Sequence, residues 1–414
     1  ADSNMLTKYI PSIIFATILA IGWGPLNVPL PGLPHMPIRQ LPDEVFEEPL
    51  MNMTGPLTPN TALRSATVLF NNTILSSETV APSEDGRSIT LIDRYGNVFT
   101  ASYNTSAPGG YSIDQPAPRA RLPASGRPLG FKRDADGNLI VCYSAGGLVK
   151  LEQGTGPAGT DKVVTLASFV SLDSAIDAGS PLQYVNDLDI APDGTVYFTD
   201  SQNLPPMPNW GVATGKARMR PYYDTLKAYL YGVYSGSITG RLCAYYPNNG
   251  SVHVLAKGFW FANGVALSAD ASYVAFAETN RFRVLRYWLS GELAGKVDIL
   301  INGLPGMPDG VDRAADGSFW VALASKRGPL WKAMEHKIVR TIVPYLPVMP
   351  PIPKWGAVIK VSQEGEITRF LMDPDGANVG FVTAAEESHA PDGSGKTRLW
   401  MGSVKEHYVS YIDV

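Results

Sequence analysis

The sequence is poor in cysteine and in charge. Its 414 residues include only 2 cysteines, Cys142 and Cys243, and 17% charged residues. Two cysteines do not indicate a disulfide framework, and each lies in an apolar, strand-like run where a thiol usually packs as a small buried hydrophobe. The net charge of -4 is small, and no run of Lys or Arg forms a basic stripe. These features argue against nucleic acid as a partner.

The sequence also lacks the short motifs that mark several enzyme classes. It contains no Gly-x-Ser-x-Gly elbow, no Walker loop and no Cys/His spacing typical of a zinc site. Its 5 histidines share no position in the repeat described below, and only His389 stands just before an inner turn. Histidine is therefore not the expected catalytic group.

The longest apolar run is short for a membrane span. Tyr9–Trp23 carries no charge but is only about 15 residues long, where a span needs about 20. We expect residues 1–24 to form a short or tilted N-terminal membrane anchor. A signal-type apolar segment and a segment packed on a partner protein remain alternatives. Residues 25–60 are dense in proline, which predicts a semi-rigid, extended linker.

The rest of the chain repeats one unit. The sequence has 40 Gly and 34 Pro, a composition that suits many short strands joined by tight turns. Six turn centres are each followed by an apolar strand, and outer-strand pairs lie between them. The turn centres are Asp85-Gly86, Asp136-Gly137, Asp193-Gly194, Asp270, Asp316-Gly317 and Asp392-Gly393. Six such units predict an all-β fold in which residues 61–414 form a six-bladed β-propeller.

Two insertions and one closure complete the predicted ring. Gln202–Ser235 and Lys326–Lys354 are long excursions between otherwise short loops, and loops of this length often cover a site. The second has a helical pattern. We expect the strand-like segment Ala66–Leu75 to pair with the last strands, Tyr408–Val414, and so to close the ring.

Four oxygen-bearing side chains occupy one position in four repeats. Glu78, Asn186, Asn263 and Asp309 each stand seven residues before an inner turn. Each alone is an ordinary turn former or surface group. In a propeller, however, residues that enter the innermost strands point into the mouth of the channel, so the four should converge. Two amide and two carboxylate side chains make an all-oxygen set that suits Ca²⁺, and the lack of His and Cys argues against Zn²⁺.

A bound Ca²⁺ would suit ester or lactone hydrolysis. The cation would polarise the carbonyl and stabilise the oxyanion that forms when water attacks. Such a reaction also needs a base, and Asp309 and Glu78 are the candidates, provided that one is not fully committed to the metal. The matching positions in the other two repeats, Leu129 and about Ala385, are apolar, so the site should be one-sided.

Three stretches carry a resemblance to a known family. They are VNDLDIAPDGTVYFTDS, the segment from Gly240 to Gly295, and LPGMPDGVDRAADGSFWVALASKR. The chain resembles the strictosidine synthase-like family from about Pro59 to Val414, including a membrane-anchored member. The resemblance implies a six-bladed propeller related to calcium-dependent lactonases and arylesterases such as gluconolactonase and paraoxonase. It places the metal ligands on the four residues identified above by their spacing.

The chain departs from the family pattern at several positions. Ser76 and Ser77 stand where the family has Gly and Pro before the glutamate that matches Glu78. Strictosidine synthase uses a glutamate near the last inner strand, but Val382–Ala384 are not acidic, and Glu386 matches only through an alignment gap. The histidine pair of paraoxonase has no counterpart. Amine–aldehyde condensation is therefore not expected.

Two functions remain open at this point. The first is a membrane-tethered, Ca²⁺-dependent hydrolase of hydrophobic esters or lactones, with a single span and the propeller on the lumenal or extracellular side of a plasma or organelle membrane. Four N-x-[ST] sequons, at Asn52, Asn71, Asn104 and Asn249, are compatible with that side. The alternative is a non-catalytic propeller that serves as an accessory subunit of a membrane protein complex.

Overall fold

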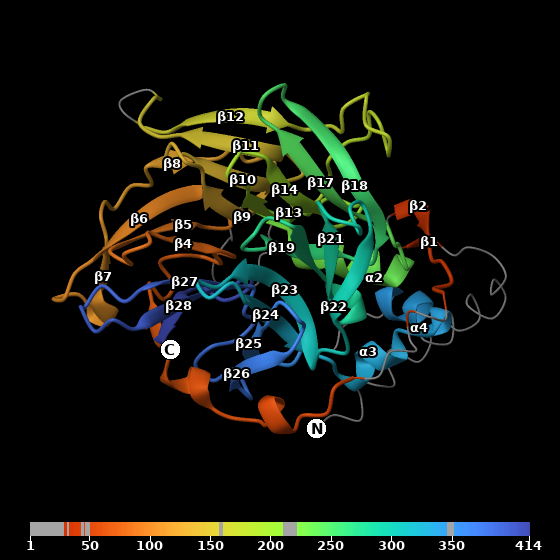
Figure 1. Ribbon diagram of the computed structural model, residues 1–414. Coiled ribbons are helices and arrows are strands. Elements are labelled where there is room, and N and C mark those ends of the chain that lie inside the picture. Colours follow the sequence, from red (N-terminus) through yellow and green to blue (C-terminus); the bar gives the residue numbers. More distant parts are fainter. Residues whose placement is uncertain are drawn as a thin grey trace.

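Six antiparallel sheets surround a central channel in the computed structural model (Figure 1). The structure describes residues 29–30, 33–42, 45, 50–156, 160–209, 222–345 and 352–414. The predicted anchor, residues 1–24, lies outside these ranges. Within them, no helix is long and apolar enough to cross a membrane.

Each sheet is one blade of four strands, numbered from the channel outward. The innermost strands are β4 (Val80–Pro82), β9 (Arg127–Arg133), β13 (Val185–Ile190), β19 (Ala262–Leu267), β23 (Gly306–Arg313) and β27 (Ala384–His389). The second strands are β5 (Ser88–Ile92), β10 (Leu139–Ser144), β14 (Val196–Asp200), β20 (Tyr273–Glu278), β24 (Phe319–Lys326) and β28 (Thr397–Gly402). The predicted six-bladed propeller is confirmed.

The outer strands complete the blades. The third strands are β6 (Asn97–Tyr103), β11 (Gly147–Glu152), β17 (Gly240–Tyr246), β21 (Arg283–Trp288), β25 (Gly356–Val361) and β29 (Val409–Asp413). The fourth are β7 (Tyr111–Ile113), β12 (Lys162–Ala167), β18 (Ser251–Phe259), β22 (Val297–Ile301), β26 (Ile367–Asp373) and β3 (Thr67–Leu69). A short strand, β8 (Ala120–Arg121), also pairs with β6.

The inner hairpins form because the turn residues allow a sharp reversal. Gly194 adopts a φ of 85°, in the left-handed region that favours glycine. The repeat without this glycine places Ala271 at a φ of 55° instead. Asp270 supports that turn by accepting hydrogen bonds from Ser272 N at 3.0 Å and Ser268 Oγ at 2.8 Å. Short polar side chains thus replace the missing glycine.

The core lies between the blades. All six residues of β10 and all six of β20 are buried, as expected for strands that pack against neighbouring blades on both faces. Cys142 and Cys243 are buried in these layers as free thiols, which confirms their predicted structural role. The outermost strand β12 is partly exposed along its length.

The ring closes through the N-terminal strand, as predicted. β3 pairs antiparallel with β29, with Leu69 opposite Val409 and Thr67 opposite Tyr411. The last blade therefore contains three strands from the C-terminal end and one from residues 67–69. This pairing joins segments that lie far apart in the sequence and leaves no gap between the first and last blades.

Both insertions lie at the end of the channel where the inner strands begin, which we call the upper face. Alternation of strand direction puts the second-to-third and fourth-to-first connections there. The first insertion contains β15 (Met207–Asn209), β16 (Tyr222–Asp224) and α2 (Thr225–Ser235). The second contains α3 (Pro329–Ala333), α4 (Lys337–Ile342) and the 3₁₀ turn η7 (Val343–Tyr345), which confirms its helical pattern.

The described part of the predicted linker packs on the propeller. It includes β1 (Pro29–Leu30), β2 (Leu33–Pro37) and the 3₁₀ turn η2 (Gly55–Leu57). Ile38, Leu41, Val45 and Leu57 are buried, and Arg39 N donates to Ser235 O, at the end of α2, at 2.7 Å. The segment is thus fixed by apolar contacts at intervals, which its proline content did not indicate.

Candidate functional site

The four residues predicted to bind a metal lie at the upper end of the channel. Asn186, Asn263 and Asp309 are on the inner strands β13, β19 and β23, and Glu78 lies two residues before β4. These strands belong to one closed ring of neighbours, in which β13 contacts β19, β19 contacts β23, and β27 joins β23 to β4. All four side chains are buried, with exposed fractions of 3% to 9%.

The segment before Asn186 is held by a buried ion pair. Asp200, at the end of β14, accepts a hydrogen bond from Tyr184 N at 2.6 Å and is paired with Arg241 on β17. The next residue, Ser201, accepts a hydrogen bond from Asn186 Nδ2 at 2.9 Å and donates to Ala262 O of the next blade at 2.5 Å. The amide group is thereby fixed with its nitrogen toward Ser201.

The next blade repeats this arrangement around Asn263. Glu278, at the end of β20, accepts a hydrogen bond from Trp260 N at 2.7 Å and is paired with Arg283. Thr279 accepts a hydrogen bond from Asn263 Nδ2 at 3.1 Å and donates to Pro308 O at 2.7 Å. In both blades an acid ends the second strand and a hydroxyl residue follows it. The hydroxyl residue orients the asparagine, so this pair of residues is the local sequence signal.

Two oxygens of the site are buried without a partner. In the described ranges, neither Asn186 Oδ1 nor Glu78 Oε2 has a hydrogen-bond partner. Burial of an unpaired oxygen costs about 1–3 kcal/mol, and more for a charged group. A bound cation would remove this cost, so the unpaired oxygens fit a metal site.

The two carboxylates repel each other. Burial raises the pKa of Glu78 well above its usual range, Asp309 raises it further, and Arg127 opposes the shift. Burial also raises the pKa of Asp309 to about 7, while a hydrogen bond from Asn263 opposes the shift. A divalent cation would stabilise both charged forms, so the electrostatics also fit Ca²⁺.

In the part of the chain that the structure describes, no group of three or more His, Cys, Asp or Glu side chains is arranged to hold a metal ion. The predicted quartet has only two acidic members, and its other two donors are amides. The site thus depends on the asparagine oxygens as much as on the carboxylates.

The loop that carries Glu78 adopts an unusual conformation at the position where the family has glycine. Ser76 has a φ of 59°, in the left-handed region, and is fully buried. Its hydroxyl accepts a hydrogen bond from Arg94 and donates to Lys405 O at 3.2 Å. Thr383 Oγ1 donates to Glu78 O at 2.9 Å. These bonds hold the loop without glycine.

The first insertion covers the mouth of the channel. Ala228 of α2 is fully buried in an apolar cluster with Leu129, Tyr184 and Phe261. Tyr184 donates to Thr225 O at 3.2 Å, and the rings of Tyr184 and Phe261 meet edge to face at 5.3 Å. Burial, together with the charges of Glu78 and Asp309, raises the pKa of Tyr184. This apolar cluster therefore lies close to the quartet.

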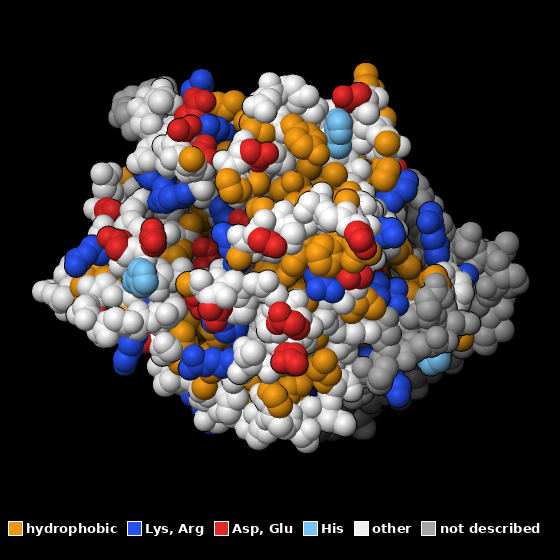
Figure 2. Space-filling view, viewed as in Figure 1, with side chains coloured by type: hydrophobic (Ala, Val, Ile, Leu, Met, Phe, Trp, Pro, Cys, Tyr) orange, Lys and Arg blue, Asp and Glu red, His pale blue; other side chains and the backbone are white. Residues whose placement is uncertain are grey.

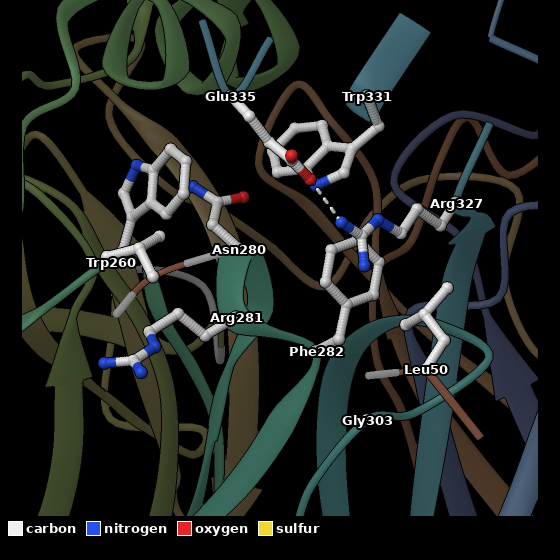
Figure 3. Close-up of a pocket in the computed structure, with 10 residues that line it drawn as sticks. Leu50, Trp260, Asn280, Arg281, Phe282, Gly303, Arg327, Trp331 and Glu335 are labelled. Atoms are coloured by element: carbon white, nitrogen blue, oxygen red, sulfur yellow. Dashed lines mark hydrogen bonds and ion pairs between the residues drawn. The ribbon is translucent and has the colours of Figure 1, made fainter. Parts of the chain in front are cut away.

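A small pocket lies beside this cover, between the connection from β20 to β21, α3 and the linker (Figure 3). Trp331 of α3 faces Trp260 with ring centroids 5.9 Å apart, and Arg327 pairs with Glu335 at 2.5 Å. Asn280, which also lines the pocket, accepts a hydrogen bond from Tyr229 of α2 at 2.8 Å. The residues that line the pocket thus connect the two insertions to the propeller.

A second polar layer in the channel was missed by the sequence reasoning. Lys132 of β9 pairs with Asp189 of β13 at 3.5 Å and with Asp312 of β23 at 3.3 Å. Burial and Asp312 raise the pKa of the neighbouring Asp187 to about 8. Glu386 of β27 adds another buried oxygen, and its pKa is raised by burial and by Asp312. Lys132, Asp189 and Asp312 each stand four residues before an inner turn, and this shared offset was the available signal.

His389 lies at the other end of the channel. It lines an open cavity of about 430 Å³ with Glu84, Arg313 and Glu387 at the ends of the inner strands. The structure therefore separates this histidine from the quartet. Figure 2 shows charged side chains of both signs interspersed on one face, without a basic stripe, in line with the sequence analysis.

Known proteins match this chain over most of its length. A family model described as strictosidine synthase matches residues 220–292. The adipocyte plasma membrane-associated protein of Rattus norvegicus is 30% identical over 386 residues, which cover 88% of this chain and 90% of the relative. The strictosidine synthase-like protein 10 of Arabidopsis thaliana is 33% identical over 303 residues, which cover 70% of each chain.

Solved structures confirm the fold. A gluconolactonase from Xanthomonas campestris superposes with a TM-score of 0.51 at 16% identity, covering 89% of this chain and 95% of that one. Regucalcin from Agrobacterium tumefaciens, titled a calcium-binding protein, has a TM-score of 0.50 at 15% identity and covers 84% and 94%. At such identities the likeness concerns the propeller alone.

Proposed function

The chain belongs to the strictosidine synthase-like family, and from this premise we propose that it is a membrane-associated, Ca²⁺-dependent hydrolase of esters or lactones. One observation carries the proposal: four buried oxygen donors from four blades include two oxygens without a partner and two carboxylates with raised pKa values. Two propellers of the same fold support it, since one is a gluconolactonase and the other a calcium-binding protein.

Glu78, Asn186, Asn263 and Asp309 would hold the ion. When bound, the cation supplies positive charge that polarises the substrate carbonyl and stabilises the developing oxyanion. Ser201 and Thr279 orient the two amides so that their oxygens are available. The two amides are thus oriented in the absence of the ion.

The cover over the mouth selects and shields the substrate. Tyr184, Phe261 and Leu129 would hold an apolar acyl or aromatic group. Because α2 closes the same space, it would also exclude bulk water and strengthen electrostatic interactions inside. This arrangement favours a hydrophobic ester or lactone.

Asp309 and Glu78 are the groups that would take the proton from water. The water oxygen bonds to the carbonyl carbon, its proton passes to a carboxylate oxygen, and the proton then moves to the alkoxide that leaves. Asp309 is the better base, because Glu78 also interacts with Arg127.

Hydrolysis assays test this function directly. The purified protein should cleave phenyl acetate or an aliphatic lactone, EDTA should abolish the activity, and Ca²⁺ should restore it. Asn263→Ala should lower kcat/KM by at least about 100-fold, since it removes a ligand and leaves Asp309 without its hydrogen bond. Asn138→Ala, in the turn after β9, is the matched control. Full activity of Asn263→Ala would refute the mechanism.

Four features support membrane association. The family relatives include proteins named for the plasma membrane, the apolar segment Tyr9–Trp23 precedes the described residues, and β1 contacts α2 at the upper face. Four of the nine exposed large apolar side chains in the described ranges lie on the two insertions or on the linker beside them. They are Leu50, Leu226, Ile338 and Tyr345. The full chain should float with lipid vesicles, and loss of residues 1–28 should weaken flotation.

Ala228 of the covering helix α2 is completely buried, which favours one alternative. If α2 does not open, the propeller would act as a non-catalytic accessory subunit of a membrane complex, with the ion holding the channel together. Mild solubilisation should then recover the protein with partners, and the pure protein should bind Ca²⁺ without hydrolysing esters. A monomeric, active preparation would exclude this alternative.

A further inference from the structure

Two arginines from different blades converge beside the loop of Glu78. Arg94 lies on the turn between β5 and β6, and Arg127 is the first residue of β9; their exposed fractions are 9% and 1%. Arg94 Nη2 donates to Ser76 Oγ, and Arg127 Nη2 donates to Ser76 O at 3.1 Å. Both guanidinium groups therefore meet at one residue, two positions before Glu78.

Their donors are not fully used. A guanidinium has five N–H groups. Arg94 Nε and Arg127 Nε are both buried, and neither has a hydrogen-bond partner among the described residues. The other bond of Arg127 goes to Val404 O at 3.3 Å, and that of Arg94 goes to His407 Nε2 at 2.9 Å. None of these partners carries a negative charge.

His407 does not change this balance. Burial and Arg94 lower the pKa of His407, so its ring is neutral and accepts the hydrogen bond from Arg94. Burial and the charge of Arg94 also lower the pKa of Arg127 to about 10. The two guanidinium groups thus repel each other in a space from which water is largely excluded.

Glu78 is the main carboxylate that acts on Arg127. Under the proposed function, however, its charge is shared with a divalent cation. The weaker charge of Asp93, which already accepts hydrogen bonds from Asn97, is then the carboxylate charge left to Arg127, and a buried charge that is poorly compensated is costly. An anion next to the metal site would restore the balance.

The pair also lies next to the first insertion, which covers the mouth of the channel. Tyr222 of the first insertion covers Arg94, with 5.0 Å between the guanidinium carbon and the ring centroid. Its strand, β16, contacts β9, which begins with Arg127. The arginines therefore lie between the loop of Glu78 and the first insertion.

We propose that Arg94 and Arg127 form a carboxylate-binding subsite next to the metal centre. The planar fork of arginine matches the two oxygens of a carboxylate and can donate two parallel hydrogen bonds. The ligand is either the carboxylate product of ester or lactone hydrolysis or a carboxylate that the substrate itself carries. This inference rests on the proposed function for the source of the acid.

Benzoate is a suitable probe, because it combines a carboxylate with an apolar ring. Calorimetric titration of the full chain with benzoate should show one site in the presence of Ca²⁺. Arg94→Gln and Arg127→Lys should each weaken binding by about tenfold or more, since a charge-assisted or bidentate contact is lost. Arg313→Gln, at the opposite mouth, should change affinity less than twofold. Equal affinity in all four proteins would overturn the subsite.

A second measurement does not depend on variants. Benzoate should shift the ¹⁵N–¹H resonances of two buried arginine Nε–H groups in the wild-type protein, because these are the unpaired donors. Unchanged arginine resonances at saturating benzoate would contradict the assignment, even if the variants failed to fold.

Kinetics distinguish the two sources of the carboxylate. If the substrate carries it, Arg94→Gln should lower kcat/KM for monophenyl succinate about tenfold more than for phenyl acetate. If the product carries it, both substrates should respond equally, and benzoate inhibition should weaken about tenfold in this variant. Binding of benzoate without Ca²⁺ binding or turnover would keep the subsite and reject the proposed hydrolase.

Discussion

At the residue scale, the hydroxyl groups behind the asparagines decide whether the site is ready for a cation. Thr279 fixes the amide of Asn263 and ties it to Pro308 O of the next blade. Residues that orient a metal ligand typically contribute 10- to 100-fold to affinity. The donor set thus depends on side chains that would not touch the ion.

Replacement of Thr279 by Val keeps the shape of the side chain and removes the hydroxyl. We expect Ca²⁺ affinity to fall by about tenfold, because Asn263 can then rotate its oxygen away from the channel. Calorimetry or a competition titration with a fluorescent chelator measures the change. Thr368→Val on the exposed outer strand β26 is the matched control. If both variants bind Ca²⁺ like the wild type, Thr279 does not orient the ligand.

Ser76 permits a test of the unusual loop. A non-glycine residue in the left-handed region costs about 1–2 kcal/mol, and Ser76 offsets this cost through its bonds to Arg94 and Lys405. Ser76→Ala keeps the strained backbone and loses the bonds, whereas Ser76→Gly relieves the backbone. The glycine variant should therefore unfold in urea with a free energy at least about 1 kcal/mol above that of the alanine variant. The reverse order would contradict this reading.

The four predicted ligands could be identified from sequence because they share one offset from the inner turns. The Lys132 layer shares an offset of four residues from the same turns, but a lysine among acids does not resemble a set of metal ligands, so the layer was missed. The role of Ser76 depends on a contact between distant parts of the chain. Its partner Lys405 lies more than 300 residues away.

At the scale of elements, an ion pair at the end of the second strand links the second and third strands in two blades. Asp200 and Arg241 join β14 to β17, and Glu278 and Arg283 join β20 to β21. In both cases the carboxylate also holds the backbone that leads to a candidate ligand. Both pairs are buried, so removal of one member would leave the charge of the other buried and unpaired.

Arg241→Met should leave the charge of Asp200 buried and unpaired. Removal of one partner of a buried pair costs about 3–5 kcal/mol, so the urea midpoint should fall markedly. Arg286→Met breaks a comparable pair with Asp298 on the outer strands, where Asp298 is 38% exposed. That control should cost only about 0–1 kcal/mol. Equal losses in the two variants would show that burial does not set the cost.

Element positions were predictable where turns and strands repeat, and less so in the insertions. The apolar composition of Gln202–Ser235 indicated a cover, but not that α2 would place Ala228 against Leu129 and Phe261. The linker was expected to be extended because of its prolines. Its buried apolar residues, such as Ile38 and Leu41, are fixed by tertiary contacts with α2 and its surroundings.

At the scale of the whole molecule, the ring depends on closure by β3. Without residues 1–69, β29 would present an open edge, which favours aggregation. We expect this truncation to lower the thermal midpoint strongly and to form oligomers in size-exclusion chromatography. Removal of residues 1–28 alone, which keeps β3, should leave a monomeric fold. Equal behaviour of the two truncations would contradict the role of β3.

The raised pKa values of two carboxyl groups in the channel predict how the stability of the protein changes with pH. The pKa values of Glu78 and Asp309 are raised in the folded, metal-free protein, so the folded state holds protons that the unfolded state releases. Stability of the metal-free protein should therefore fall as the pH rises from about 5 toward 8.

Thermal melts with Ca²⁺ and with EDTA at several pH values test this prediction. The gain in midpoint from Ca²⁺ should be larger at pH 8 than at pH 5.5, because protons compete with the ion for the same carboxylates. Glu78→Gln should reduce this pH dependence. A gain from Ca²⁺ that is constant with pH would show that the ion binds elsewhere.

The central claim is that one cation binds where four blades meet. Crystals of the full chain grown with CaCl₂ would show it directly in an anomalous difference map. We predict one peak about 2.3–2.6 Å from oxygens of Glu78, Asn186, Asn263 and Asp309. A map that is empty at this point, with calcium at another position or absent, would contradict the account.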